Sequence, residues 1–77
     1  MDTKSIIAVA RLIDELGGIE GRTRLQKIVH LLGVRFPTEF RQGFTLHYFG
    51  PFSSELASEI DFLCAAGLVK EQAPPSG

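Results

Sequence analysis

The chain has 77 residues, of which 44% are hydrophobic and 22% charged, and its formal net charge is −1. This length holds one domain, and the composition is typical of a protein that folds around a core. No apolar run approaches a membrane span, and the first residues lack the pattern of a signal peptide. The one cysteine, Cys64, excludes an internal disulfide. We therefore expect a cytoplasmic protein, with one domain over residues 1–72, a flexible tail over residues 73–77 and no membrane partner.

Residues 5–16 show the apolar spacing of an amphipathic helix, which falls on Ile6, Val9, Ala10, Ile13 and Leu16. Asp2 or Thr3 is placed to cap its start, and Gly17 with Gly18 is placed to end it.

A second helix is predicted over residues 22–32 and ends at Gly33. Its apolar face consists of Leu25, Ile28, Val29 and Leu32.

Residues 44–49 are rich in aromatic and β-branched side chains and predict one short strand, with Phe44, Leu46 and Tyr48 on one side. Gly50 and Pro51 then predict a turn that orients the third helix.

The third helix begins at Ser53 or Ser54 and ends at Gly67, and its apolar stripe consists of Leu56, Ile60 and Leu63. Leu68 and Val69 predict a further strand that leaves this helix. The fold class expected from these elements is mainly α: a winged-helix-like three-helix domain with one or two short β-strands.

Two segments carry a family resemblance. They are R-L-Q-K-I-V-H-L-L over residues 24–32 and H-Y-F-G-P-F-S-S-E-L over residues 47–56. Together they resemble the YwgA-like group of small bacterial and archaeal proteins, and more distantly the antitoxin-associated Panacea domains. The resemblance implies a winged-helix-like fold and no settled activity. Members of the group are typically longer than this chain.

Positive charge gathers over residues 22–41, which contain a single acid, Glu39. The candidate phosphate-binding residues are Arg22, Arg24, Lys27, Arg35 and Arg41. Five such contacts would give non-specific binding to double-stranded DNA that weakens with salt. The third helix, which reads the major groove in helix-turn-helix proteins, instead exposes carboxylates that repel phosphate. The alternative for the basic residues is an ordinary solvated helix face.

A second candidate surface surrounds the aromatic segment and consists of His47, Tyr48, Phe49, Phe52, Glu55 and Glu59. Exposed aromatic side chains of this kind usually mark a protein partner. His30, His47 and Cys64 lack the spacing of a metal site, and no nucleophile or phosphate-binding loop is present, so we predict no enzyme, metal or cofactor. A DNA-linked regulatory module is the leading interpretation. The alternative is a protein-interaction or dimerisation module, including an antitoxin-like role.

Overall fold

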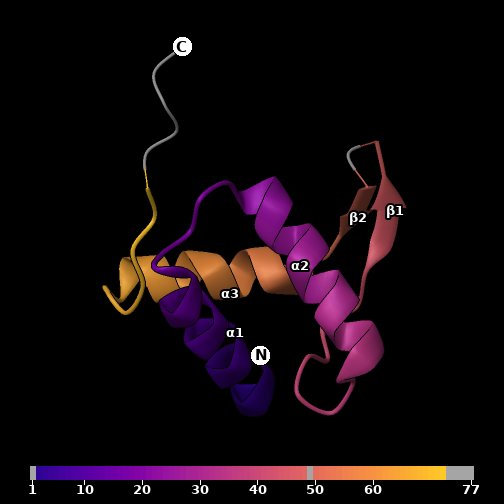
Figure 1. Cartoon of the computed structure of the whole chain (residues 1–77), viewed down its shortest axis with the longest axis horizontal. Coiled ribbons are helices and arrows are strands. Elements are labelled where there is room, and N and C mark those ends of the chain that lie inside the picture. Colours follow the sequence, from indigo (N-terminus) through magenta and orange to yellow (C-terminus); the bar gives the residue numbers. More distant parts are fainter. Residues whose placement is uncertain (1, 49, 73–77) are drawn as a thin grey trace.

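The computed structural model describes residues 2–48 and 50–72 (Figure 1). The order of elements is α1 (Thr3–Leu16), α2 (Arg22–Arg35), β1 (Thr45–His47), β2 (Gly50–Phe52) and α3 (Ser54–Ala65). A mainly α fold with three helices and two short strands is therefore confirmed. In Figure 1, α3 lies across the other helices, and the strands lie beyond α2. Within the described part of the chain, no helix is long and apolar enough to cross a membrane.

The helix ends mostly follow the predicted capping residues. Asp2 Oδ1 accepts the N–H of Lys4 at 3.0 Å, and Gly17 ends α1 in the left-handed region at φ 82°. Ser53 caps α3, as its Oγ accepts the N–H of Leu56 at 3.1 Å. Gly33 does not end α2, which continues for two further residues. A Cβ at Gly33 would lie 3.1 Å from the carbonyl oxygen of Phe40. The absence of a side chain at this position therefore lets the loop that follows α2 pack closely against the helix.

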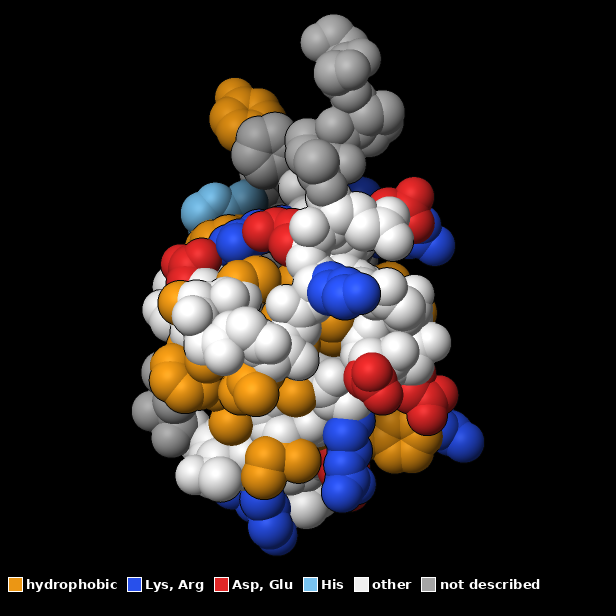
Figure 2. Space-filling view, turned by 90° about the vertical axis from the view of Figure 1, so that its left-hand side faces the viewer, with side chains coloured by type: hydrophobic (Ala, Val, Ile, Leu, Met, Phe, Trp, Pro, Cys, Tyr) orange, Lys and Arg blue, Asp and Glu red, His pale blue; other side chains and the backbone are white. Residues whose placement is uncertain are grey.

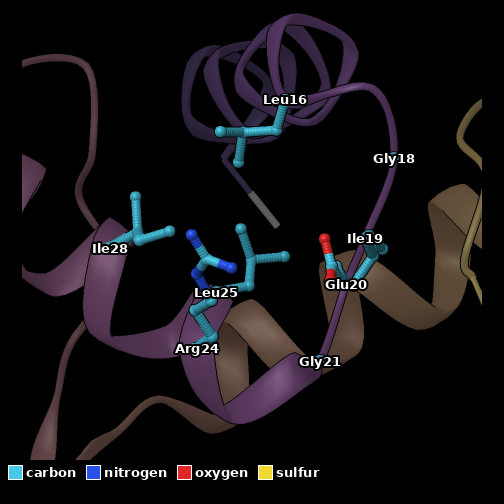
Figure 3. A pocket seen from close by; sticks show the side chains of 8 residues that line it. All are labelled: Leu16, Gly18, Ile19, Glu20, Gly21, Arg24, Leu25 and Ile28. Atoms are coloured by element: carbon cyan, nitrogen blue, oxygen red, sulfur yellow. The ribbon is translucent and has the colours of Figure 1, made fainter. Parts of the chain in front are cut away.

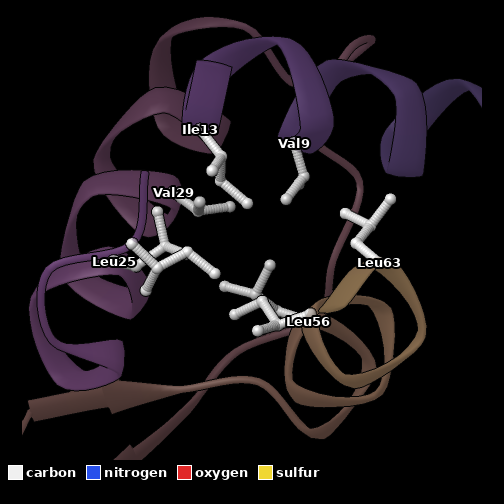
Figure 4. Close-up of a cluster of buried hydrophobic side chains, with 8 residues drawn as sticks. Val9, Ile13, Leu25, Val29, Leu56 and Leu63 are labelled. Carbon is white, nitrogen blue, oxygen red and sulfur yellow. The ribbon is translucent and has the colours of Figure 1, made fainter. Parts of the chain in front are cut away.

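The core is a single cluster to which all three helices contribute. Its buried members are Val9, Ile13, Ile19, Leu25, Val29, Leu56, Ile60 and Leu63. Figure 4 shows six of these side chains converging, two from each helix. Leu16, predicted on the inner face of α1, is 51% exposed and borders a small open hollow with Leu25 and Ile28 of α2.

The aromatic segment forms a hairpin and not a single strand. β1 pairs with β2 in antiparallel fashion, so the predicted turn at Gly50 and Pro51 is wrong, since both residues lie in β2. The chain reverses two residues earlier, after His47. A two-stranded sheet therefore lies between α2 and α3 in sequence.

The strand predicted after α3 does not form within residues 68–72. One parallel bridge joins Ile19 to Glu71, with the N–H of Ile19 donating to the carbonyl of Lys70 at 2.7 Å. The N–H of Gln72 donates in turn to the carbonyl of Ile19 at 2.9 Å. The segment is thus tied to the connector between α1 and α2. The predicted tail over residues 73–77 lies outside the described residues.

A buried amide side chain joins α2 to the start of α3. Gln26 is 5% exposed, and its Nε2 donates to the carbonyl of Ser53 at 3.0 Å. Its Oε1 accepts the N–H of Ser53 at 2.8 Å. Ser53 is itself fully buried, so water cannot replace these bonds. The pair fixes the point at which the hairpin ends and α3 begins.

A second buried polar pair joins α3 to the loop before β1. Glu59 is 2% exposed, and its Oε1 accepts from Nε2 of Gln42 at 2.7 Å. Gln42 Oε1 is buried and has no hydrogen-bond partner among the described residues. Burial raises the pKa of the Glu59 carboxyl, the Gln42 bond opposes this, and the nearby Glu55 adds to it. The prediction that Glu59 is exposed is therefore wrong: α3 turns this position toward the loop.

Removing the Gln26 amide should destabilise the fold. In Gln26→Met the Ser53 N–H stays buried without an acceptor, which costs about 1–3 kcal/mol. Urea unfolding should show a lower midpoint at an unchanged slope. Gln72→Ala, at an exposed side chain, serves as the control and should stay within about 0.5 kcal/mol. A Gln26→Met midpoint equal to wild type would show that the two bonds contribute nothing.

Glu59 should make stability fall as the pH rises. A carboxyl whose pKa is raised by folding contributes its full stability below its ordinary pKa of 4.5, and loses it as the pH rises through the raised value. Glu59→Gln removes this titration and supplies an N–H for Gln42 Oε1. The free energy of unfolding of the variant should therefore exceed that of wild type by about 1 kcal/mol or more, and this difference should grow between pH 5 and pH 8.

Urea unfolding at several pH values measures this difference. Glu39→Gln, at an exposed position, is the control and should stay within about 0.5 kcal/mol of wild type throughout. If the stability of Glu59→Gln relative to wild type falls as the pH rises, the ionised Glu59 carboxylate does not destabilise the fold, and the prediction is wrong.

Candidate interaction surface

The segment over residues 47–56 divides into a part that builds the fold and a part that faces outward. Ser53 and Leu56 are fully buried. The Glu55 side chain, predicted as part of the interaction surface, instead accepts the Gly43 N–H through Oε1 at 3.1 Å, although the residue is exposed. The serine, the glutamate and the leucine of the motif thus all have roles inside the domain.

The other part of the segment lies on the hairpin and is exposed. Tyr48 is fully exposed, Leu46 is 88% exposed and Phe52 is 37% exposed. His47 is also exposed, and its ring lies 5.2 Å from the Phe52 ring in a tilted arrangement. Phe49 lies outside the described residues. The hairpin therefore presents apolar side chains that the core does not use.

A groove of about 290 Å³ lies beside the hairpin. Its walls and floor include Thr23 and Gln26 of α2, His47 and Phe52 of the hairpin, and Ala57 and Ile60 of α3. Both polar ends of the Gln26 amide are already bonded to Ser53. The groove is consequently suited to an apolar side chain, and it offers few groups to orient a reacting molecule.

The hairpin's own side chains carry no formal charge, while Arg22 lines the groove beside it and the Lys27 side chain lies close to Gly50. Residues 42–54 contain no aspartate, glutamate, lysine or arginine. Among the described residues, the structure groups no three histidine, cysteine, aspartate or glutamate side chains as a metal site. The surface therefore offers aromatic and aliphatic contact area in place of ionic contacts.

Arg22, a predicted phosphate-binding residue, forms an ion-pair network. Its Nε and Nη2 donate to the two carboxylate oxygens of Glu71 at 2.6 and 3.0 Å, and Nη1 donates to Asp61 at 2.6 Å. The hydrogen bond from Arg22 lowers the pKa of Glu71. All three side chains are more than a third exposed, so the stability gained is modest. The network joins the start of α2 to α3 and to the segment after it.

The remaining basic candidates lie in different surroundings. Arg41 pairs with Asp2 at 3.2 Å. Arg24 extends into a small hollow of about 70 Å³ between α1 and α2, beside Leu16 (Figure 3). Lys27 and Arg35 lie elsewhere on α2, where they are exposed.

Surface charge is accordingly mixed. In Figure 2, basic and acidic side chains are interspersed over the visible face, with hydrophobic side chains between them. Two of the five basic candidates are bound to carboxylates. Folding therefore pairs Arg22 and Arg41 with carboxylates, whereas Arg24, Lys27 and Arg35 form no ion pair among the described residues.

Two residues that matter here were missed by the sequence analysis. Gln26 was assigned no role, although its place in the first motif was a usable signal. Leu46 was left out of the predicted surface, although strand alternation placed it on the same side as Tyr48. Its exposure follows from the hairpin projecting beyond α2, which the alternation alone does not reveal.

Comparison with known proteins gives one informative similarity. No family model matches the chain, and no solved structure matches it. "Uncharacterized protein YwgA" of Bacillus subtilis (strain 168) is 34% identical over 62 residues, which cover 79% of this chain. The chain spans about a third of the length of that relative, since the match covers 36% of it. The distant similarity to Panacea domains stays a prediction. The identity across most of the chain agrees with the two motifs, and the chain belongs to the YwgA-like family.

Proposed function

We propose that this domain is a non-enzymatic protein-interaction module that self-associates through its hairpin, residues 45–52. The observation that carries the proposal is the exposure of Leu46 and Tyr48 on a sheet that has two strands among the described residues. Aromatic side chains such as that of Tyr48 are enriched at protein interfaces and form hot spots where the partner buries the ring.

The motif supports this proposal. Its buried residues have structural roles, whereas the side chain of Tyr48 has no contact that the fold requires, being fully exposed. The absence of charge over residues 42–54 suits contact between these segments of two identical copies, because their own side chains bring no like charges together. A cytoplasmic location forms part of the proposal and agrees with a lone cysteine, Cys64. An antitoxin-like role is one form that such a module takes.

DNA-linked regulation is a second candidate, and one specific observation favours it. Arg24, Lys27 and Arg35 form no ion pair among the described residues. They fall within about 80° of one another around the axis of α2, at 3.6 residues per turn. Three phosphate contacts would give a salt slope of about −2.7, so affinity would fall by about 40-fold between 50 and 200 mM salt.

Self-association is tested by sedimentation velocity and light scattering over a range of protein concentrations. We expect the mass to rise with concentration and Tyr48→Ser to weaken association by about fivefold or more, because an interface aromatic is lost. Leu68→Ser is the matched control, since Leu68 is also exposed (66%) but lies after α3. A monomer at every concentration, or equal losses in both variants, would contradict the proposal.

The DNA candidate is tested in the same cell with a random-sequence duplex at several salt concentrations. The triple variant Arg24→Ala, Lys27→Ala, Arg35→Ala should abolish binding if this candidate holds, while Tyr48→Ser should leave it unchanged. Co-sedimentation that the triple variant retains would place any phosphate contacts elsewhere. Absence of duplex binding at 50 mM salt would dismiss the candidate.

A further inference from the structure

The register of the hairpin determines which backbone groups point outward. Leu46 lies opposite Pro51, and proline has no N–H, so this pair cannot exchange the two hydrogen bonds of a bonded pair, and we infer that it is a non-bonded pair. Bonded and non-bonded pairs alternate in an antiparallel ladder, and the bonded pairs are therefore Thr45 with Phe52 and His47 with Gly50. The N–H and C=O of Leu46 consequently point away from β2, toward the outer edge of β1.

The two outer edges of the sheet differ. β2 lies against α2, and the residue that faces its outer edge is Pro51, which has no N–H to donate. β1 is the outermost element on that side of the molecule (Figure 1). Leu46 makes no backbone hydrogen bond outside the hairpin within the described residues. β1 is thus the edge at which a further strand can be added.

Nothing on the β1 edge protects it from pairing. Proteins usually block such an edge with lysine or another charge, with proline, or with a covering loop. Residues 42–48 contain neither charge nor proline, and Leu46 is 88% exposed. The composition of β1 is therefore typical of a strand whose outer edge pairs with another strand in the functional protein.

We propose that β1 pairs with β1 of a second copy of this chain, antiparallel about a two-fold axis at Leu46, to form a four-stranded sheet. The inference rests on the proposed self-association and adds the contact that produces it. Leu46 then lies opposite the partner's Leu46, and Thr45 lies opposite the partner's His47. Each Leu46 N–H donates to the carbonyl of the other.

A second copy fits this edge for two reasons. Pairing about a single central residue is self-complementary, because both copies present the same donor and acceptor. The cross-strand pairs, Leu46 with Leu46 and Thr45 with His47, carry no formal charge, so they bring no like charges opposite each other. With three-residue strands the contact is small, below the roughly 1,200 Å² of a standard interface, and the dimer should be weak and concentration-dependent.

Two substitutions at one position separate backbone pairing from side-chain contact. Leu46→Pro removes an N–H that the hairpin itself does not use, whereas Leu46→Ser keeps the N–H and shortens the side chain. Sedimentation should show that Leu46→Pro is monomeric and that Leu46→Ser still associates, with both variants folded by circular dichroism. Equal loss of association in the two variants would overturn the proposed pairing.

A cross-link tests the register. In a Cys64→Ser background, Leu46→Cys should form a disulfide between copies under mild oxidation, because directly bonded strand pairs have Cα atoms about 5.5 Å apart, within disulfide range. Leu31→Cys, at a position 68% exposed on α2, is the control and should not cross-link. Self-association without a Leu46→Cys disulfide would overturn the register and leave the proposed function standing. A monomeric wild-type chain would overturn both.

Discussion

The clasp between Gln26 and the backbone of Ser53 is the constraint on which the rest of the structure depends. Its two hydrogen bonds, at 2.8 and 3.0 Å, are buried and join the second turn of α2 to the residue that follows the hairpin and caps α3. If Ser53 moved, the N-cap that Leu56 uses would be lost, and Leu56 would leave the centre of the core. The direction of α3 and the position of the hairpin are therefore set by one side chain.

This clasp gives a physical meaning to both motifs of the family. The glutamine of the first motif and the serine of the second bond directly to each other, although 27 residues separate them. Glu55 adds a bond to Gly43 on the other side of the hairpin. Both ends of the hairpin are thereby anchored, which allows Leu46 and Tyr48 between them to remain exposed without unfolding a two-stranded sheet that would be marginal alone.

The sequence predicted the parts of the fold that depend on local chemistry. Helix spacing, the caps at Asp2 and Ser53 and most of the core follow from nearby residues. It did not predict the hairpin, because Pro51 in a strand is acceptable only at an edge, and which strand is an edge depends on packing. The sequence also misplaced Glu59. A carboxylate on a helix is ordinarily exposed unless a residue distant in sequence donates a hydrogen bond to it, as Gln42 does here. The pairing of Arg22 with Glu71, 49 residues away, was likewise beyond any local pattern.

The distribution of polar groups explains why the hairpin, and not α2, is the stronger candidate surface. Arg22 and Arg41 already have carboxylate partners, and a phosphate would have to displace them. Within residues 2–48 and 50–72 the peptide groups of Leu46 make no backbone hydrogen bond outside the hairpin, and replacing water by a strand costs little desolvation. An uncharged edge of this kind is a hazard for aggregation, and pairing it with one defined partner removes that hazard while stabilising the sheet. The same proline that closes the β2 edge then limits growth, because a four-stranded sheet formed through β1 ends in β2 on both sides.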